Sequence, residues 1–261
     1  MRTPSPPRPE SALRRLLPEP SGPVDPADAY ADLPAAEGRP GLRLNMVASI
    51  DGAISVDGRS GGLGGGADRR VYLALRALTD VVLVAAGTAR AEGYGPARIP
   101  GQLAAGRAAR GQAPAPRIAV VTRSLSLDWE GPMFADAHAD SQPVVITSAA
   151  APADGLRRAE RAGAEVLVAG DAEVDLPAAL VALGAAGARS VLAEGGPRLN
   201  AALAAADLID EICTTVSPRL VGGGAGRALD GPEPRPGGRA MRLWAVYEEE
   251  GFLFMRHRAE R

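Results

Sequence analysis

The chain has 261 residues and a formal net charge of -2, which gives no overall basic footprint for nucleic acid. Its hydrophobic fraction is 46%, while aromatic residues make up only 3%, so we expect a core of Ala, Val and Leu that is large enough to need no disulfide. The single cysteine, Cys213, excludes an internal disulfide and a four-cysteine zinc site, and we expect no metal.

No run approaches the ~20 apolar residues of a membrane-spanning helix. The Pro- and Arg-rich start lacks the continuous apolar segment of a secretory signal, so we expect a cytoplasmic protein with no membrane partner. The two histidines, His138 and His257, lie far from the motifs described below. There is no Gly-x-Ser-x-Gly elbow, so nothing supports a serine hydrolase.

Residues 1–40 hold many prolines and little periodic pattern, and we interpret them as an N-terminal arm that is packed on the domain or partly disordered. Within this arm we predict short helices at 10–17 and 26–33. Residues 41–261 form the second unit, in which regular patterns begin at Leu42.

Largely apolar runs of four to nine residues predict the strands of this unit. They cover 42–50, 53–56, 80–86, 117–122, 143–147, 165–169, 190–193 and 211–218, followed by a terminal hairpin of 242–248 and 252–258. Helical spacing covers 67–78, 151–162, 176–186 and 197–206, whereas 93–116 is interpreted as a loop. Alternating strands and helices predict a doubly wound, mostly parallel α/β sheet with a C-terminal antiparallel hairpin.

The segment from Ser190 to Leu199 carries the clearest ligand signal. An apolar strand ends in Glu194, and Gly195 and Gly196 then lead to Pro197 at the start of a helix. Free N–H groups at such a helix start favour an anion, and ligands of parallel sheets bind at the carboxyl ends of the strands. A plain strand–helix connection would also account for this pattern.

Four segments in this order resemble one family. They are Asn45 to Gly52 (NMVASIDG), Leu75 to Thr88 (LRALTDVVLVAAGT), Leu192 to Pro197 (LAEGGP) and Val216 to Gly223 (VSPRLVGG). They are similar to the reductase domain of the riboflavin pathway, which has a dihydrofolate-reductase-like fold. The Ala91–Gly95 segment and the Pro-rich arm resemble the stand-alone pyrimidine reductase proteins of high-GC bacteria.

This resemblance implies an NADPH-dependent enzyme that reduces the ribosyl group of 5-amino-6-ribosylaminouracil 5′-phosphate to a ribityl chain. It also implies a homodimer that binds a small molecule, while the net charge leads us to expect no nucleic-acid partner. The zinc deaminase signatures of the two-domain enzymes are absent, so deamination would need another protein.

The resemblance also assigns site residues. Asp51 and Glu194 are the candidate catalytic residues. Asp51 would deliver a proton or orient the substrate, although an Asp-Gly pair is also a common turn. The expected cofactor contacts are Ala48, Gly87, Thr88, Thr122, Arg123, Gly195, Gly196, Pro197, Arg198 and Leu199, and Thr147 and Ser148 would border the adenosine. The expected substrate contacts are Asn45, Ser60, Arg76, Glu92, Arg98 and Glu194.

Several positions depart from the family pattern. The loop after Ser60 consists largely of glycine (Gly61–Gly66), Ala53 follows Asp-Gly where a cation is common, and Glu92-Gly93-Tyr94 replaces Asp-Asp-Pro. These changes affect the substrate more than the cofactor. Two alternatives therefore remain: an NADPH-dependent dihydrofolate or pterin reductase, and a non-catalytic nucleotide-binding protein.

Overall fold

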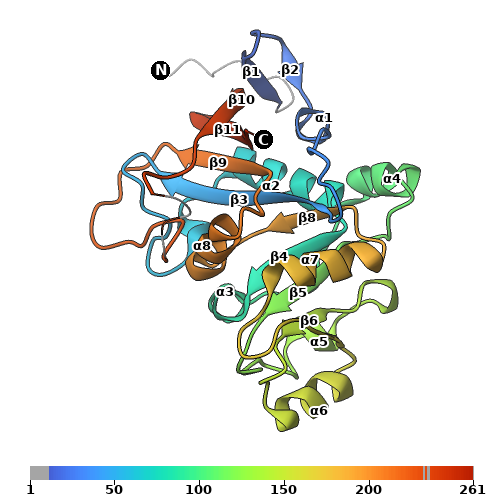
Figure 1. The fold of residues 1–261 in the computed structure, drawn as a ribbon. Coiled ribbons are helices and arrows are strands. Elements are labelled where there is room, and N and C mark those ends of the chain that lie inside the picture. The colour runs from blue at the N-terminus through green and yellow to red at the C-terminus, as the bar shows by residue number, and fades with distance from the viewer. Residues whose placement is uncertain (1–11, 232, 234–235, 261) are drawn as a thin grey trace, which may run out of the picture.

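The structure is a computed structural model that describes residues 12–231, 233 and 236–260. Its described residues form one eleven-stranded mixed sheet in the order β2-β1-β10-β11-β9-β3-β8-β4-β5-β6-β7. Helices cover both faces, so the predicted doubly wound sheet is confirmed (Figure 1). No helix in the described part of the chain is long and apolar enough to cross a membrane.

The strands from β9 to β7 in this order run parallel to their neighbours. In chain order they are β3 (Gly41–Ser49), β4 (Val81–Ala85), β5 (Arg117–Val121), β6 (Val144–Thr147), β7 (Glu165–Val168), β8 (Ser190–Ala193) and β9 (Glu211–Ser217). All seven were predicted within about two residues. Their short apolar runs are typical of strands that are buried on both faces, as β4 and β6 are here.

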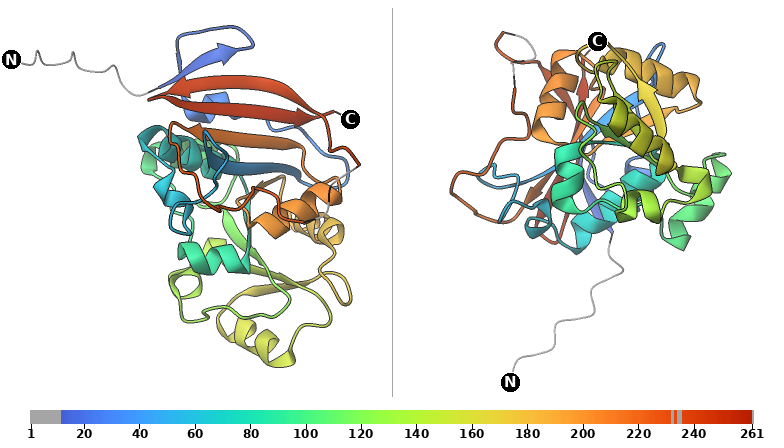
Figure 2. Two further views of the ribbon diagram at one scale, coloured as in Figure 1. Left: turned by 90° about the vertical axis from the view of Figure 1, so that its left-hand side faces the viewer. Right: turned by 90° about the horizontal axis from the view of Figure 1, so that it is seen from below.

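The antiparallel end of the sheet consists of β10 (Met241–Glu249), β11 (Phe252–Ala259), β1 (Leu13–Leu17) and β2 (Pro23–Val24). The predicted terminal hairpin is confirmed, and its turn uses positive φ angles of 54° at Glu250 and 82° at Gly251. Both turn residues in the left-handed region are typical of a two-residue hairpin loop. Figure 2 shows β10 and β11 between β9 and the arm.

The predicted helix at 10–17 is wrong where the structure describes it. Residues 13–17 form β1, which pairs with β10 and brings Arg14 against Glu248 at 2.9 Å. Residues 10 and 11 lie outside the described part of the chain. The local pattern was too short to specify a helix, and pairing with β10 decided the conformation. The described arm therefore extends the sheet.

The helices divide between the two faces. On one face α7 (Leu176–Ala185) and α8 (Pro197–Ala205) pack on β3, β4, β6 and β8. On the other face lie α2 (Gly66–Leu78), α3 (Ala86–Glu92), α5 (Pro132–Ala135) and α6 (Ala153–Arg161). The arm helix α1 (Pro26–Ala29) and α4 (Gly101–Ala109) contact α2, and the single-turn 3₁₀ segments are η1 (Ser60–Gly62) and η2 (Ala139–Ser141).

Three further local predictions need correction. The segment 93–116 is not all loop, because Arg107 of α4 is 1% exposed and donates to the carbonyls of Ala77 and Thr79 at the end of α2. The expected return strand at 53–56 is reduced to one bridge between Val56 and Arg59. The helix expected at 26–33 ends at Ala29.

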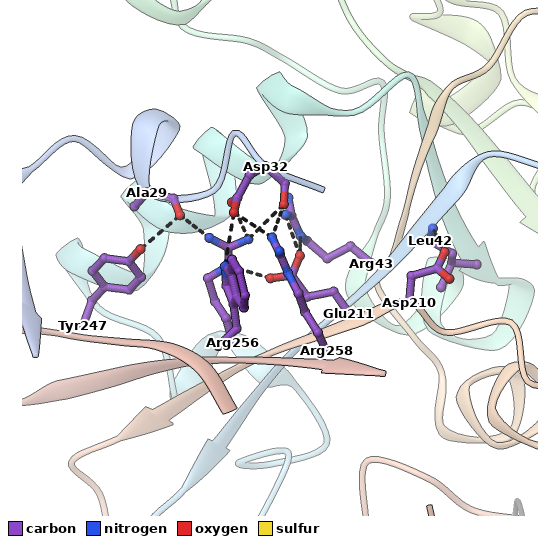
Figure 3. Close-up of polar contacts among 10 residues, drawn as sticks. Ala29, Asp32, Leu42, Arg43, Asp210, Glu211, Tyr247, Arg256 and Arg258 are labelled. Atoms are coloured by element: carbon purple, nitrogen blue, oxygen red, sulfur yellow. Dashed lines mark hydrogen bonds and ion pairs between the residues drawn. The ribbon is translucent and has the colours of Figure 1, made fainter. Parts of the chain in front are cut away.

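The end of α1 has a tertiary cause. The carbonyl of Ala29, which a longer helix would pair with the N–H of Leu33, instead accepts hydrogen bonds from Tyr247 and Arg256 of an ion network (Figure 3). In that network Glu211, which is fully buried, accepts from Arg43 at 2.8 Å and from Arg256 at 2.5 Å. Asp32 of the arm completes the network by accepting from Arg256 at 2.7 Å.

Candidate functional site

Several of the predicted site residues lie at one edge of the sheet because neighbouring parallel strands end there. Asp51 follows β3, Glu194 follows β8, Gly87 follows β4, and Thr122 and Thr147 stand at the ends of β5 and β6. Strands β3, β8, β4, β5 and β6 are consecutive in the sheet. This edge is where open α/β sheets bind ligands.

A buried carboxylate cluster lies at the centre of this edge. Arg76 of α2 donates from Nε to Oε1 of Glu194 at 2.8 Å and from Nη2 to Oε2 at 2.6 Å. The Tyr94 hydroxyl donates to the same Oε2 at 2.6 Å. The Arg76 and Glu194 side chains are only 10% and 4% exposed. Because both carboxylate oxygens are engaged, Glu194 is fixed in position, and the pair leaves Nη1 of Arg76 for another partner.

Two tyrosines surround this ion pair. The Arg76 guanidinium lies 4.4 Å from the ring centroid of Tyr72 and 5.4 Å from that of Tyr94. Burial disfavours the charged guanidinium, but the charge and hydrogen bonds of Glu194 outweigh it and raise the pKa of Arg76. Burial, followed by the charge of Glu194, raises the pKa of both tyrosines, so they stay protonated hydrogen-bond donors.

Sequence reasoning missed both tyrosines as site residues. Tyr72 precedes Arg76 by four residues, so the two share one helix face, and this spacing could have indicated the contact. The sequence marked Tyr94 only as a residue that departs from the family pattern. Its partner Glu194 is 100 residues away, so local spacing could not indicate the contact.

The expected substrate residues do not all come together. The backbone N–H of Ser60 donates to Oε1 of Glu92 at 2.9 Å, which ties the glycine-rich loop to the end of α3. Arg98 is exposed and instead lines a hollow of about 330 Å³ with His138 and Asp136. Asn45 and Ala48 lie on β3, opposite Cys213 and Val216 of β9.

The Gly195–Gly196 turn is tightly enclosed, and its peptide bond is cis. Gly195 has a φ of 99°, and its carbonyl accepts from Ala85 at 2.8 Å. A Cβ at Gly196 would lie 2.5 Å from the Thr88 hydroxyl, so only glycine fits there. Pro197 begins α8 as predicted. Gly195 and Gly196 are buried, whereas Gly87 at the neighbouring strand end is exposed. A Cβ at Gly87 would meet nothing within 4 Å, so this is the open part of the edge.

Asp51 supports a neighbouring loop. Its carboxylate accepts from the Ser49 hydroxyl at 2.6 Å and from the backbone N–H groups of Val221 and Gly222 at 3.1 and 2.6 Å. The bond from Ser49, followed by those from Val221 and Gly222, lowers the pKa of Asp51 to about 2. An acid with this pKa is ionised at neutral pH, so the geometry favours orientation over proton delivery.

The loop that Asp51 holds continues over the start of α8. There the side chain of Asn200 donates to the carbonyl of Ala228 at 2.8 Å, and the N–H of Asp230 donates to the carbonyl of Pro197 at 3.1 Å. Of the other α8 residues, Arg198 is 92% exposed and Leu199 is buried in the core, so Leu199 offers a ligand only its backbone.

The residues along this edge fit a dinucleotide. The first-turn N–H groups of Arg198 and Leu199 have no acceptor within the helix. Gly87 leaves room for a close approach, and the Thr147 hydroxyl is buried without a protein partner among the described residues. The last expected cofactor residue, Arg123, follows β5 and forms an ion pair with Glu173. Sequence reasoning missed Glu173.

The fold and this edge define an α/β protein of the class that binds its ligand at the carboxyl ends of parallel strands. Residues 40–248 match the family model described as the RibD C-terminal domain, and the chain belongs to this family. The predicted resemblance is therefore confirmed.

Relatives and solved structures agree with this family. A protein of Archaeoglobus fulgidus named 2,5-diamino-6-ribosylamino-4(3H)-pyrimidinone 5′-phosphate reductase is 31% identical over 71% of this chain and 83% of its own length. A protein of the same name from Methanothermobacter thermautotrophicus is 32% identical over 73% and 83%. The crystal structure of a pyrimidine reductase-like protein from Corynebacterium diphtheriae superposes with a TM-score of 0.80 at 26% identity, over 91% of this chain and all of that one.

Proposed function

We propose that this protein is an NADPH-dependent reductase of a ribosylaminopyrimidine 5′-phosphate, with 5-amino-6-ribosylaminouracil 5′-phosphate as its substrate. The observation that carries the proposal is the buried cluster of Arg76, Glu194 and Tyr94 beside the open edge over Gly87. Buried charges are costly unless paired, so a cluster of this kind at a ligand-binding edge points to function. The names of the relatives favour a pyrimidine phosphate over a pterin.

In the proposed reaction the nicotinamide, when bound, supplies a hydride to C1′ of the ribosyl group. The bond between C1′ and the ring oxygen breaks, and that oxygen takes a proton. Glu194 holds Arg76 and Tyr94 in fixed positions, and Nη1 of Arg76 is available to a substrate hydroxyl or phosphate. Asp51 holds the loop at 221–222 through its carboxylate, so we assign it an orienting role. We assign the proton taken by the ring oxygen to solvent.

A second substrate has a specific observation in its favour. Both archaeal relatives are named for the 2,5-diamino-pyrimidinone, in which an amino group stands where the uracil has an oxygen. The ribosyl chemistry is the same for both compounds, so the Glu194 cluster would serve either one.

The test is the oxidation of NADPH, followed by absorbance, with the uracil, the diamino-pyrimidinone and dihydrofolate as separate substrates. We expect turnover of the uracil, and faster turnover of the diamino compound would change only the preferred ring. Turnover of dihydrofolate alone would replace the proposal with a pterin reductase. NADPH binding without any turnover would leave the non-catalytic alternative.

The quaternary structure and location stay predictions. We expect a homodimer, which sedimentation of the purified protein would measure, and a cytoplasmic location.

A further inference from the structure

An exposed ion pair stands at the far end of the cofactor edge. Arg123 lies just after β5, and Glu173 lies in the turn after β7, with only β6 between these strands. The side chains are 62% and 71% exposed, and Nη1 of Arg123 contacts Oε1 of Glu173. Both charges therefore face solvent at the edge where the expected dinucleotide would continue from Gly87.

The turn that carries Glu173 is closely built. Gly170 has a φ of 85°, and a Cβ there would lie 2.3 Å from the carbonyl of Glu173. The carbonyl of Gly170 accepts a hydrogen bond from the N–H of Ala149 at 2.9 Å. The Ser148 hydroxyl donates to the carbonyl of Ala172 at 3.3 Å. These bonds tie the turn to the end of β6. Glu173 is thus held at this edge by its backbone as well as by its partner.

The two charges favour opposite forms of a nicotinamide dinucleotide. A guanidinium suits the 2′-phosphate of NADPH, whereas a carboxylate suits the free 2′-hydroxyl of NADH and repels a phosphate. Along the strand order, the adenosine half would reach β5 to β7 once the nicotinamide lies near β8 and β4.

Resting on the proposed function, we infer that Glu173 is a specificity residue that occupies Arg123 and thereby limits the preference of this protein for NADPH over NADH. Binding of the 2′-phosphate requires Arg123 to leave Glu173 and leaves the carboxylate beside a dianion. Binding of NADH keeps the ion pair intact.

The test is the dissociation constant of NADPH and of NADH, each measured by fluorescence titration without substrate. For Glu173→Gln we expect NADPH to bind about 2- to 5-fold more tightly and the affinity for NADH to change less than about twofold, as fits an exposed charge. The gain should shrink in high salt, because exposed charges are screened. Arg123→Ala should weaken the binding of NADPH and leave the binding of NADH unchanged.

Glu165→Gln is the matched control. Arg117 and Glu165 form an ion pair at 2.7 Å on the same strands β5 and β7, but at their opposite ends. This variant should leave both constants unchanged.

The outcomes separate the two proposals. If the wild-type protein binds neither dinucleotide, this result contradicts the proposed function and therefore also the inference that rests on it. If both dinucleotides bind but Glu173→Gln leaves their ratio unchanged, or Glu165→Gln shifts it equally, only the inference is overturned.

Discussion

In the proposed function the Arg76–Glu194 pair has both a structural and a functional role. Removing one partner leaves a buried charge without compensation, which costs about 3–5 kcal/mol in comparable pairs. We expect Glu194→Gln to lower the free energy of unfolding by about this amount, measured by urea denaturation, and also to remove reductase activity. Activity loss alone would therefore be ambiguous.

The double variant Arg76→Met, Glu194→Met resolves this ambiguity. Replacing a buried ion pair by apolar side chains of similar size is often neutral for stability, so the double variant should regain most of the lost stability. Its activity should stay low, because no charge remains to position the substrate. A stable and active double variant would show that the pair serves folding only.

At the scale of single elements, the start of α8 and the start of α3 meet at Gly196 and Thr88. Gly196→Ala would push its Cβ into the Thr88 hydroxyl, so we expect a large loss of thermal stability. Adding Thr88→Ala to Gly196→Ala should restore part of that stability, because it removes the clashing oxygen. Equal melting temperatures for the single and double variants would contradict this packing.

Gly87→Ala probes the same edge from its open side. The added methyl meets nothing within 4 Å and replaces a helical glycine, so we expect unchanged or higher thermal stability. If the dinucleotide approaches closely there, its affinity should fall, as fluorescence titration would measure. If Gly87→Ala binds the dinucleotide with the affinity of the wild-type protein, the dinucleotide does not approach the start of α3 closely.

The arm is a further element with its own pH dependence. Burial raises the pKa of Asp32, but the charges and hydrogen bonds of Arg256 and Arg258 outweigh it and hold this pKa below 3.8. The contribution of Asp32 to stability is therefore complete above the unfolded pKa near 4 and is lost as the pH falls through the lower folded value.

We expect Asp32→Asn to cost about 1 kcal/mol at pH 7, since the side chain is 53% exposed. The cost should vanish at acid pH, where the wild-type carboxylate is protonated. Urea denaturation across this pH range measures both. Asp28→Asn, an exposed acid on α1, is the matched control and should change little. An equal cost at all pH values would contradict this role.

The elements show what the sequence could and could not predict. The strands from β3 to β9 and the Glu194–Gly196 turn are encoded in local apolar runs and turn residues, so pattern reading found them. Strand β1 and helix α4 depend on partners elsewhere: β10 for the former, and the carbonyls that Arg107 meets for the latter. Short segments of this kind take their conformation from tertiary contacts.

The same limit applies to the candidate site. The sequence predicted the parallel strands that Glu194, Gly87 and Arg123 follow, and the family resemblance assigned these residues to the site. It gave no sign that Tyr94 meets Glu194 or that Glu173 meets Arg123, pairs that are 100 and 50 residues apart.

At the scale of the whole molecule, Cys213 reports on unfolding. It lies on β9 in the core, and burial raises its pKa to about 12, so the native thiol should resist thiol reagents at pH 8. Its protonated form contributes stability that is lost as the pH rises above the unfolded value near 9.

We expect the labelling rate of Cys213 to follow global unfolding in urea. The exposed variant Ser126→Cys should show a second thiol that reacts at once. Immediate labelling of the wild-type protein would mean that β9 opens without unfolding of the whole sheet.

The proposed reaction transfers a hydride from a nicotinamide to C1′ of a ribosylaminopyrimidine phosphate. The most direct measurement uses NADPH deuterated at its transferable position, with the pyrimidine products analysed by mass spectrometry and NMR. Hydride transfer to C1′ predicts a ribityl product that carries the deuterium at C1′. A product without deuterium, or unchanged substrate in the presence of bound NADPH, would contradict it.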